Sequence, residues 1–218
     1  WDTPDLAALL EAFSLNFDRL AAVIGGNPIV RGLLNLAHLL KFNSRHGSRR
    51  NIRAHYDLGN DFYSLWLDPS MTYSSAIFAR PDEDLAAAQD EKYAALARAI
   101  GLRSGEHVLE IGCGWGGFAE FAARETGARV TAITISQAQA EFARRRIHEA
   151  GLNDRAEIRL IDYRDVKGQF DRIASIEMFE AVGEAYWPTY FDKVSDLLAP
   201  GGRAGLQVIT IRDDLFAD

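Results

Sequence analysis

The residues best suited to chemistry form a glycine-rich loop beside an acidic side chain. Residues 110–117 read EIGCGWGG and directly follow the apolar pair Val108 and Leu109. Glycine lets the backbone approach a ligand closely and adopt positive φ angles without a Cβ clash. A strand that turns through such glycines into a helix is typical of a cofactor site. A glycine turn without a ligand would cost stability that packing alone does not require.

Two cofactor classes are open from this loop. Gly112, Gly114 and Gly117 satisfy the G-x-G-x-x-G fingerprint of dinucleotide sites, which is a weak signal by itself. S-adenosylmethionine is favoured because Glu110 stands two residues before the first glycine. There its carboxylate can accept a hydrogen bond from the loop or from the cofactor's amino group. It is favoured also because residues 134–136 read TIS, where a dinucleotide site carries its ribose-binding acid. The missing acid departs from the usual methyltransferase pattern as well.

A second polar pair follows the next apolar run. Asp162 and Tyr163 come directly after residues 156–161, the usual place for contacts to the adenine of a methyltransferase cofactor. The alternative is a surface aspartate that closes a strand. We expect the pair to contact the cofactor.

The elements that must position these residues alternate along the chain. Apolar and β-branched runs predict strands at 107–111, 129–135, 156–161, 170–176 and 203–211, and helical patterns cover 84–100, 116–126, 137–150 and 184–198. This alternation implies a parallel sheet with right-handed crossovers, so the predicted fold class is α/β and Rossmann-like. Residues 5–24 and 29–41 predict two further helices, and the aromatic-rich segment 51–80 predicts short helices and loops.

The composition narrows the setting of the protein. The chain has 218 residues, of which 48% are hydrophobic, enough for one domain with an appendage. The single cysteine, Cys113, excludes an intrachain disulfide and favours a reducing, cytoplasmic compartment. No apolar run reaches the roughly 18 residues of a spanning helix, so we expect neither a membrane span nor a signal peptide. We expect no metal site and no nucleic acid partner.

A basic segment contrasts with the net charge of −7. Residues 19–56 hold no Asp or Glu, but they hold the basic side chains Arg19, Arg31, Lys41, Arg45, Arg49, Arg50 and Arg53. An anionic membrane surface would attract each of them by about 1 kcal/mol. A solvated linker that happens to be basic is the alternative that composition leaves open.

Six short motifs occur in order along the chain. They are YDLGNDFY at 56–63, LDPSMTYS at 67–74, GCGWGG at 112–117, TIS at 134–136, DYRD at 162–165 and MFEAVG at 178–183. In this combination the chain resembles the cyclopropane-fatty-acyl-phospholipid synthase family, which includes the mycolic acid methyltransferases. The resemblance accounts for the TIS sequence, which the family carries in place of the acid. It implies a Rossmann-like class I methyltransferase that uses S-adenosylmethionine.

The resemblance implies three parts and a set of cofactor contacts. The parts are an N-terminal helical, basic lipid-docking segment (1–50), a helical cap over the cofactor site (51–100) and the cofactor-binding domain (101–218). Sheets of this type close with two further strands, so we expect C-terminal strands beyond residue 218. The implied cofactor contacts are Tyr73, Ser74, Gly112, Gly114, Thr134, Ile135, Gln139 and Tyr163, to which the arguments above add Glu110 and Asp162.

The implied reaction is C-methylation of the double bond of an unsaturated fatty acyl chain on a phospholipid. The double bond attacks the sulfonium methyl, and proton loss from the resulting carbocation closes a cyclopropane ring. A hydride shift before proton loss gives a methyl-branched or methylene-branched chain instead. This chemistry needs a dry pocket, aromatic faces and a shielded base. Two other functions stay open: a small-molecule N-methyltransferase of the same superfamily and a non-catalytic lipid-binding module.

The family's base is a bicarbonate ion held by a Cys main-chain amide, a Glu, a His and a Tyr. Glu180 matches the family Glu, Ser75 stands at the Cys position and Gln207 at the His position, so we expect these three as catalytic residues. Glu177 and Glu184 are the nearby acids that could be mistaken for Glu180. Glutamine can bind an anion but cannot shuttle a proton. The bicarbonate, and with it the choice between ring and branched product, therefore stays open.

The expected partners follow from the implied substrate and the basic segment. We expect an unsaturated acyl lipid as substrate and an anionic membrane surface as docking partner. The predicted location is cytoplasmic and peripherally membrane-associated. A homodimer is a further option that the sequence does not decide.

Overall fold

The structure is a computed structural model that describes residues 4–17 and 59–212. The chain divides into two compact units, Trp1–Gly47 and Ser48–Asp218. In the first unit, α1 (Leu6–Leu15) begins after Asp5, whose Oδ1 accepts a hydrogen bond from the Ala8 amide at 2.9 Å.

The predicted helix 5–24 is present over its first half. The second half of this helix lies outside the described residues. So do the predicted helix 29–41 and the basic segment 19–56. Among the helices of residues 4–17 and 59–212, none is long and apolar enough to cross a membrane.

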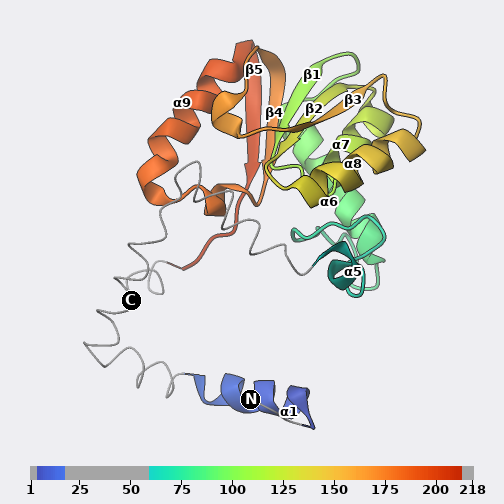
Figure 1. Cartoon of the computed structure of the whole chain (residues 1–218), viewed down its shortest axis with the longest axis vertical. Helices are drawn as coiled ribbons and strands as arrows, with labels where there is room; N and C mark the ends of the chain where they lie inside the picture. The colour runs from blue at the N-terminus through green and yellow to red at the C-terminus, as the bar shows by residue number, and fades with distance from the viewer. Residues whose placement is uncertain (1–3, 18–58, 213–218) are drawn as a thin grey trace. The chain divides into compact units, whose positions relative to one another are not determined.

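Within residues 59–212, five parallel strands form one sheet. They are β1 (His107–Ile111), β2 (Arg129–Thr134), β3 (Ala156–Leu160), β4 (Phe170–Ile176) and β5 (Leu198–Gln207). Their order across the sheet is β3-β2-β1-β4-β5 (Figure 1). The predicted α/β, Rossmann-like sheet is confirmed. The order reverses between β1 and β4, and ligands of such sheets bind at the carboxyl ends of the strands beside that point.

The helices lie where the sequence predicts them. They are α5 (Gly59–Tyr63), α6 (Leu85–Ile100), α7 (Gly117–Phe121), α8 (Gln137–Glu149) and α9 (Trp187–Leu197). A π-helical turn (Ala122–Thr126) extends α7, and three 3₁₀ turns cover Tyr163–Asp165, Phe179–Ala181 and Glu184–Tyr186. α6 shows how these bounds arise: Asp84 caps its start with a bond from the Ala86 amide, and Gly101, at φ 65°, ends it.

Both faces of the sheet are covered, because neighbouring strand residues point to opposite sides. Val108 packs in a core cluster with residues of α6, α7 and α8, whereas Leu109 packs in a second cluster with residues of α9 such as Tyr190. Figure 1 shows α9 on one side of the sheet and α6, α7 and α8 on the other. The loops at the strand ends therefore follow strands that are packed on both faces.

The predicted fifth strand, 203–211, is wrong at both ends. β5 begins earlier because Leu198 already pairs with Phe170, before a shift in register. It ends earlier because the last pair joins Ile176 to Gln207, where β4 itself ends. Beyond Gln207, no strand of residues 59–212 pairs with the apolar run.

Candidate active site

The glycine-rich loop follows β1, beside the reversal point of the sheet. Gly112, Gly114 and Gly116 have φ angles of 85°, 51° and 87°, which glycine adopts without strain. A Cβ on Gly112 would lie 2.5 Å from Cγ of Met178, whereas a Cβ on Gly114 would meet no atom within 4 Å. The loop is thus tightly packed at Gly112 and has open space at Gly114, as a cofactor cradle requires.

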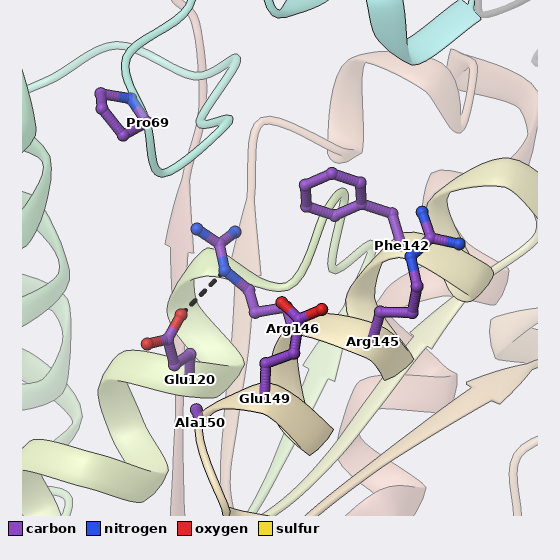
Figure 2. A pocket seen from close by; sticks show the side chains of 7 residues that line it. All are labelled: Pro69, Glu120, Phe142, Arg145, Arg146, Glu149 and Ala150. Atoms are coloured by element: carbon purple, nitrogen blue, oxygen red, sulfur yellow. Dashed lines mark ion pairs between the residues drawn. The ribbon is translucent and has the colours of Figure 1, made fainter.

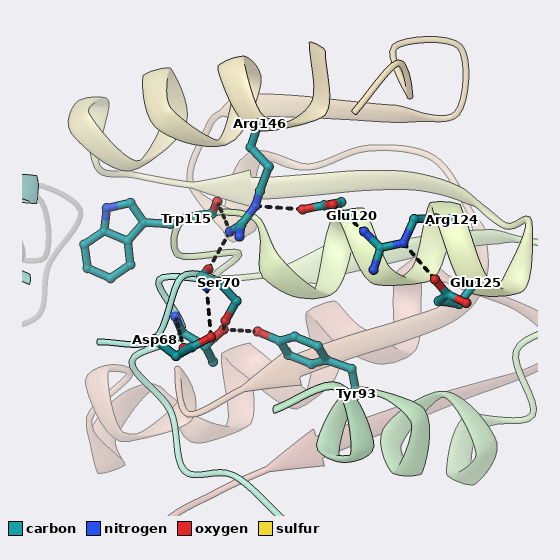
Figure 3. A network of polar contacts seen from close by, with 9 residues as sticks. Asp68, Ser70, Tyr93, Trp115, Glu120, Arg124, Glu125 and Arg146 are labelled. Atoms are coloured by element: carbon teal, nitrogen blue, oxygen red, sulfur yellow. Dashed lines mark hydrogen bonds and ion pairs between the residues drawn. The ribbon is translucent and has the colours of Figure 1, made fainter. Parts of the chain in front are cut away.

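One arginine fixes this loop to the segment that precedes α6 (Figure 3). Nη1 of Arg146 donates to the carbonyl of Ser70 at 2.6 Å and to the carbonyl of Trp115 at 3.1 Å. Nε of the same side chain lies 2.8 Å from Oε2 of Glu120 in α7. A single guanidinium therefore joins the segment, the loop and the helix that the loop opens.

Glu110 of β1 is enclosed beneath this arrangement, with 3% of its surface exposed. Burial raises its pKa to about 8, against the opposing effects of Lys92 and of a hydrogen bond from the Ala119 amide. Its Oε2 has no hydrogen-bond partner within the part of the chain that the structure describes. Glu110 thus binds the first turn of α7 through the Ala119 amide. Its contact with the cofactor remains a prediction.

Three predicted cofactor residues meet at the end of β2. The hydroxyl of Thr134 donates to Oε1 of Gln139 at 2.8 Å and accepts from the amide of Ser136 at 3.1 Å. Oγ of Ser136 in turn accepts from the Gln139 amide at 3.4 Å and caps α8. Ile135 is partly exposed between them. This turn is therefore formed by neutral side chains, at the position where a dinucleotide site has its ribose-binding acid.

The pair after β3 also lies at this edge of the sheet. Both oxygens of Asp162 accept from Arg164, at 2.8 Å from Nε and 2.7 Å from Nη2. The ring of Tyr163 is partly exposed and contacts the ring of Tyr190 edge-on at 5.3 Å. Because the Asp162 carboxylate is engaged within the chain, Tyr163 offers the freer surface to a cofactor.

Tyr73 and Ser74 lie on the segment that Arg146 ties down. Tyr73 is 47% exposed. Ser74 is held by α6, since its carbonyl accepts from Nε2 of Gln89 at 2.9 Å and its hydroxyl accepts from Nζ of Lys92 at 2.7 Å. The helix thereby sets the position of a predicted cofactor residue.

Lys92 is a residue of this candidate site that the sequence did not single out. It is 1% exposed, and burial lowers its pKa to about 8 despite the attraction of acids, of which Glu177 has the largest effect. A signal was present: Gln89, Lys92, Leu96 and Ile100 are spaced three or four apart and share one buried stripe of the helix. A lysine on such a stripe needs a polar partner.

Two of the three predicted catalytic residues meet, and they meet at Glu177. Oε1 of Glu177 accepts from the Ser75 amide at 3.0 Å, from the Ser75 hydroxyl at 2.7 Å and from Nε2 of Gln207 at 2.8 Å. Glu180 is exposed, and its Oε1 accepts from the amide of Ile209 at 2.6 Å. The structure thus places Glu177, which the sequence analysis set aside, with Ser75 and Gln207.

A separate cavity of about 340 Å³ opens between α8 and the segment around Pro69 (Figure 2). It is lined by Pro69, Glu120, Phe142, Arg145, Arg146, Glu149 and Ala150. None of the predicted site residues lines it. We assign it no part in the chemistry.

The sequence profile of the mycolic acid cyclopropane synthetase family matches residues 43–216. The chain belongs to this family. Among curated members, it is 47% identical over 176 residues to the tuberculostearic acid methyltransferase UfaA1 of Mycobacterium tuberculosis, covering 78% of this chain and 41% of that protein. It is 42% identical over 171 residues to the cyclopropane-fatty-acyl-phospholipid synthase of Escherichia coli K12, covering 78% of this chain and 44% of that one. The chain thus spans less than half of either relative.

Solved structures of the cyclopropane synthetase family share the fold. The cyclopropane synthase MmaA2 of Mycobacterium tuberculosis superimposes with a TM-score of 0.74 at 32% identity, covering 78% of this chain and 60% of that one. The mycolic acid cyclopropane synthase CmaA1, complexed with SAH and CTAB, gives a TM-score of 0.67 at 33% identity over 69% of this chain and 53% of that one. The class I methyltransferase sheet predicted from the sequence is confirmed.

Proposed function

We propose that the full-length protein methylates the double bond of an unsaturated fatty acyl chain, carried on a phospholipid, with S-adenosylmethionine as methyl donor. One observation carries the proposal: the open glycine loop lies at the reversal point of the sheet in a member of the cyclopropane synthetase family. The names of the two curated relatives, a tuberculostearic acid methyltransferase and a fatty-acyl-phospholipid synthase, support the substrate class.

The residues around the loop fit S-adenosylmethionine. Gly114 leaves room for a ligand against the backbone, and the turn after β2 carries no acid that a dinucleotide ribose would need. The residues that would hold the cofactor are Tyr73, Ser74, Gly112, Gly114, Thr134, Ile135, Gln139 and Tyr163. When bound, S-adenosylmethionine supplies an electrophilic methyl group on a sulfonium.

An aromatic cluster next to the loop suits a substrate that becomes a carbocation. We call Phe62, Tyr63, Trp66, Tyr73 and Trp115 the ring cluster. Trp115, from the loop itself, is 3% exposed and lies 5.1 Å from the ring of Tyr63. Trp66 and Tyr73 are 51% and 47% exposed, and their rings lie 5.7 Å apart. Aromatic faces attract a cation and exclude water, so the ring cluster can shelter the cation of the reacting chain.

The N-terminal unit supports membrane docking. Leu6, Leu10, Phe13 and Phe17 follow a helical spacing of four, three and four residues, and they are 48%, 59%, 51% and 68% exposed. The basic segment 19–56 follows them in the sequence. An apolar helix face followed by basic side chains is the pattern of a helix that lies on an anionic membrane. Peripheral binding at the cytoplasmic surface is therefore part of the proposal.

The test is to feed trideuteromethyl methionine to cells that express the full-length protein and to analyse their lipids by mass spectrometry. We expect acyl chains that have gained one carbon and kept two of the three deuterium atoms, because one is lost as the proton. Ring and branched products are then separated by nuclear magnetic resonance. Label confined to small amines would instead indicate an N-methyltransferase. Lipid binding without any label transfer would indicate a non-catalytic module.

A further inference from the structure

The carboxylate of Glu177 takes the place of an anion between Ser75 and Gln207. Three donors converge on its Oε1, at 3.0 Å (Ser75 amide), 2.7 Å (Ser75 hydroxyl) and 2.8 Å (Gln207 Nε2). Its second oxygen, Oε2, accepts no hydrogen bond from residues 4–17 or 59–212. One oxygen is therefore an anchor, and the other is available to take a proton.

The backbone of Glu177 is held in an unusual conformation at the end of β4. Its φ angle is 47°, in the left-handed region that residues other than glycine seldom adopt. Its amide donates to the carbonyl of Gln207 at 2.8 Å, so the pairing of β4 with β5 continues through the strained residue. Strain of this kind persists only where the surroundings enforce it, and it gathers at functional sites.

Bicarbonate, which the family resemblance implies, does not fit these atoms together with Glu177. The donors that would hold it, the Ser75 amide and the side chain at position 207, already bind Oε1 of Glu177. Lys92 adds a buried cation whose strongest attraction to an acid is to Glu177. The site therefore holds a fixed carboxylate with its own donors and its own countercharge.

We propose that Glu177 is a built-in carboxylate base, which replaces the bound bicarbonate in this protein. The inference rests on the proposed function. After methyl transfer, a proton passes from the methyl-bearing carbocation to Oε2 of Glu177. The electrons of the broken C–H bond close the cyclopropane ring or, after a hydride shift, form the double bond of a methylene branch. Glu177 becomes a neutral acid and returns the proton to water when the product leaves.

A carboxylate is sufficient as the base here. A carbocation is far more acidic than a carboxylic acid, so the rate depends on placement rather than on basicity. The Ser75 and Gln207 bonds supply that placement. In this mechanism the side chain at position 207 donates a hydrogen bond and transfers no proton. A glutamine can therefore stand at the family's histidine position.

The test uses the full-length protein, labelled S-adenosylmethionine and vesicles of an unsaturated phosphatidylglycerol, in buffer freed of bicarbonate. Wild type should keep its rate when bicarbonate is removed. E177Q should lower kcat by about 10²-fold or more, the usual scale for loss of a positioned base, with KM for the cofactor nearly unchanged. E177G, which suits the positive φ, should be inactive alone and regain activity with added formate or bicarbonate. E184Q, at an exposed acid seven residues on, is the matched control and should behave as wild type.

Three results would overturn the role of Glu177. They are wild-type activity that depends on added bicarbonate, an E177Q variant with wild-type kcat, and an E177G variant that binds S-adenosylhomocysteine but is rescued by neither anion. Failure of the proposed function looks different, because wild type itself would then label no lipid under any condition. That result would remove the inference together with the function.

Discussion

Lys92 of α6 donates a 2.7 Å hydrogen bond to the hydroxyl of Ser74 from a position that is only 1% exposed. Burying an ammonium group is costly unless polar partners compensate. The helix thus carries a costly residue at the point where it supports a predicted cofactor contact. This pattern is typical of a residue that is kept for positioning rather than for stability.

Replacing Lys92 by methionine tests this positioning role. Ser74 loses its hydroxyl partner while the buried volume is kept, so we expect affinity for S-adenosylhomocysteine to fall by roughly tenfold, about 1.4 kcal/mol. The melting temperature without ligand should change little, since the variant removes a buried charge but also removes its attraction to Glu110 and Glu177. Titration calorimetry and thermal melts measure the two effects, and Lys167→Met, at an exposed lysine, is the control. A variant that loses stability but keeps its affinity would mark Lys92 as purely structural.

The acid Glu110 should make stability depend on pH. Burial raises its pKa from 4.5 to about 8, so between these values the folded chain binds more protons than the unfolded chain. The contribution of Glu110 to the free energy of unfolding therefore falls as pH rises through this window. Glu110→Gln removes that loss, and the melting temperature of the variant relative to wild type should increase from pH 5 to pH 8. A difference that stays constant over this range would contradict the shifted pKa.

Two glycines of the loop should respond differently to substitution. Gly112→Ala places a Cβ 2.5 Å from Met178, so it should destabilise the fold by roughly 1–3 kcal/mol. Gly114→Val meets no protein atom near its Cβ, so only the strain of a β-branched residue at φ 51° destabilises the fold, while the side chain would fill the cofactor's space. Thermal melts with and without S-adenosylhomocysteine distinguish the two, because a bound ligand raises the melting temperature. A ligand-induced shift that survives in Gly114→Val would place the cofactor elsewhere.

The basic segment should bind lipid by charge. We expect the protein to bind anionic vesicles, to bind neutral vesicles less, and to lose the difference at high salt. Neutralising Arg49, Arg50 and Arg53 together should weaken the binding. Vesicle co-sedimentation is the measurement. Equal binding to both vesicle types would indicate that the segment is a linker without a role in lipid binding.

The parts of the site that could be predicted are those that a few neighbouring residues determine. Local preferences alone predict a strand, a turn and a helix from the apolar residues before Glu110 and the glycines after it. The meeting of Ser75 with Glu177 joins positions 102 residues apart, and that of Gln207 with Glu177 joins positions 30 apart. Such pairs depend on which strands lie side by side, so the motifs could name Ser75 and Gln207 but could not show that both bind Glu177.

The end of β5 was mispredicted for a related reason. Residues 208–211 are apolar and β-branched enough to extend a strand, yet a strand also needs a neighbour to pair with. β4 supplies none beyond Ile176. Strand propensity shows that a segment can form a strand. Whether it does so depends on how far the neighbouring strand extends.

The triple contact of Arg146 has a kinetic consequence. Its guanidinium holds the carbonyl of Trp115 in the glycine loop and the carbonyl of Ser70 in the segment that leads to Tyr73. On the proposed function, a cofactor that fixes the glycine loop would also fix the segment that carries Tyr73. On the proposed function, we therefore expect the methyl donor to bind before the lipid, which product-inhibition kinetics of the full-length protein would test.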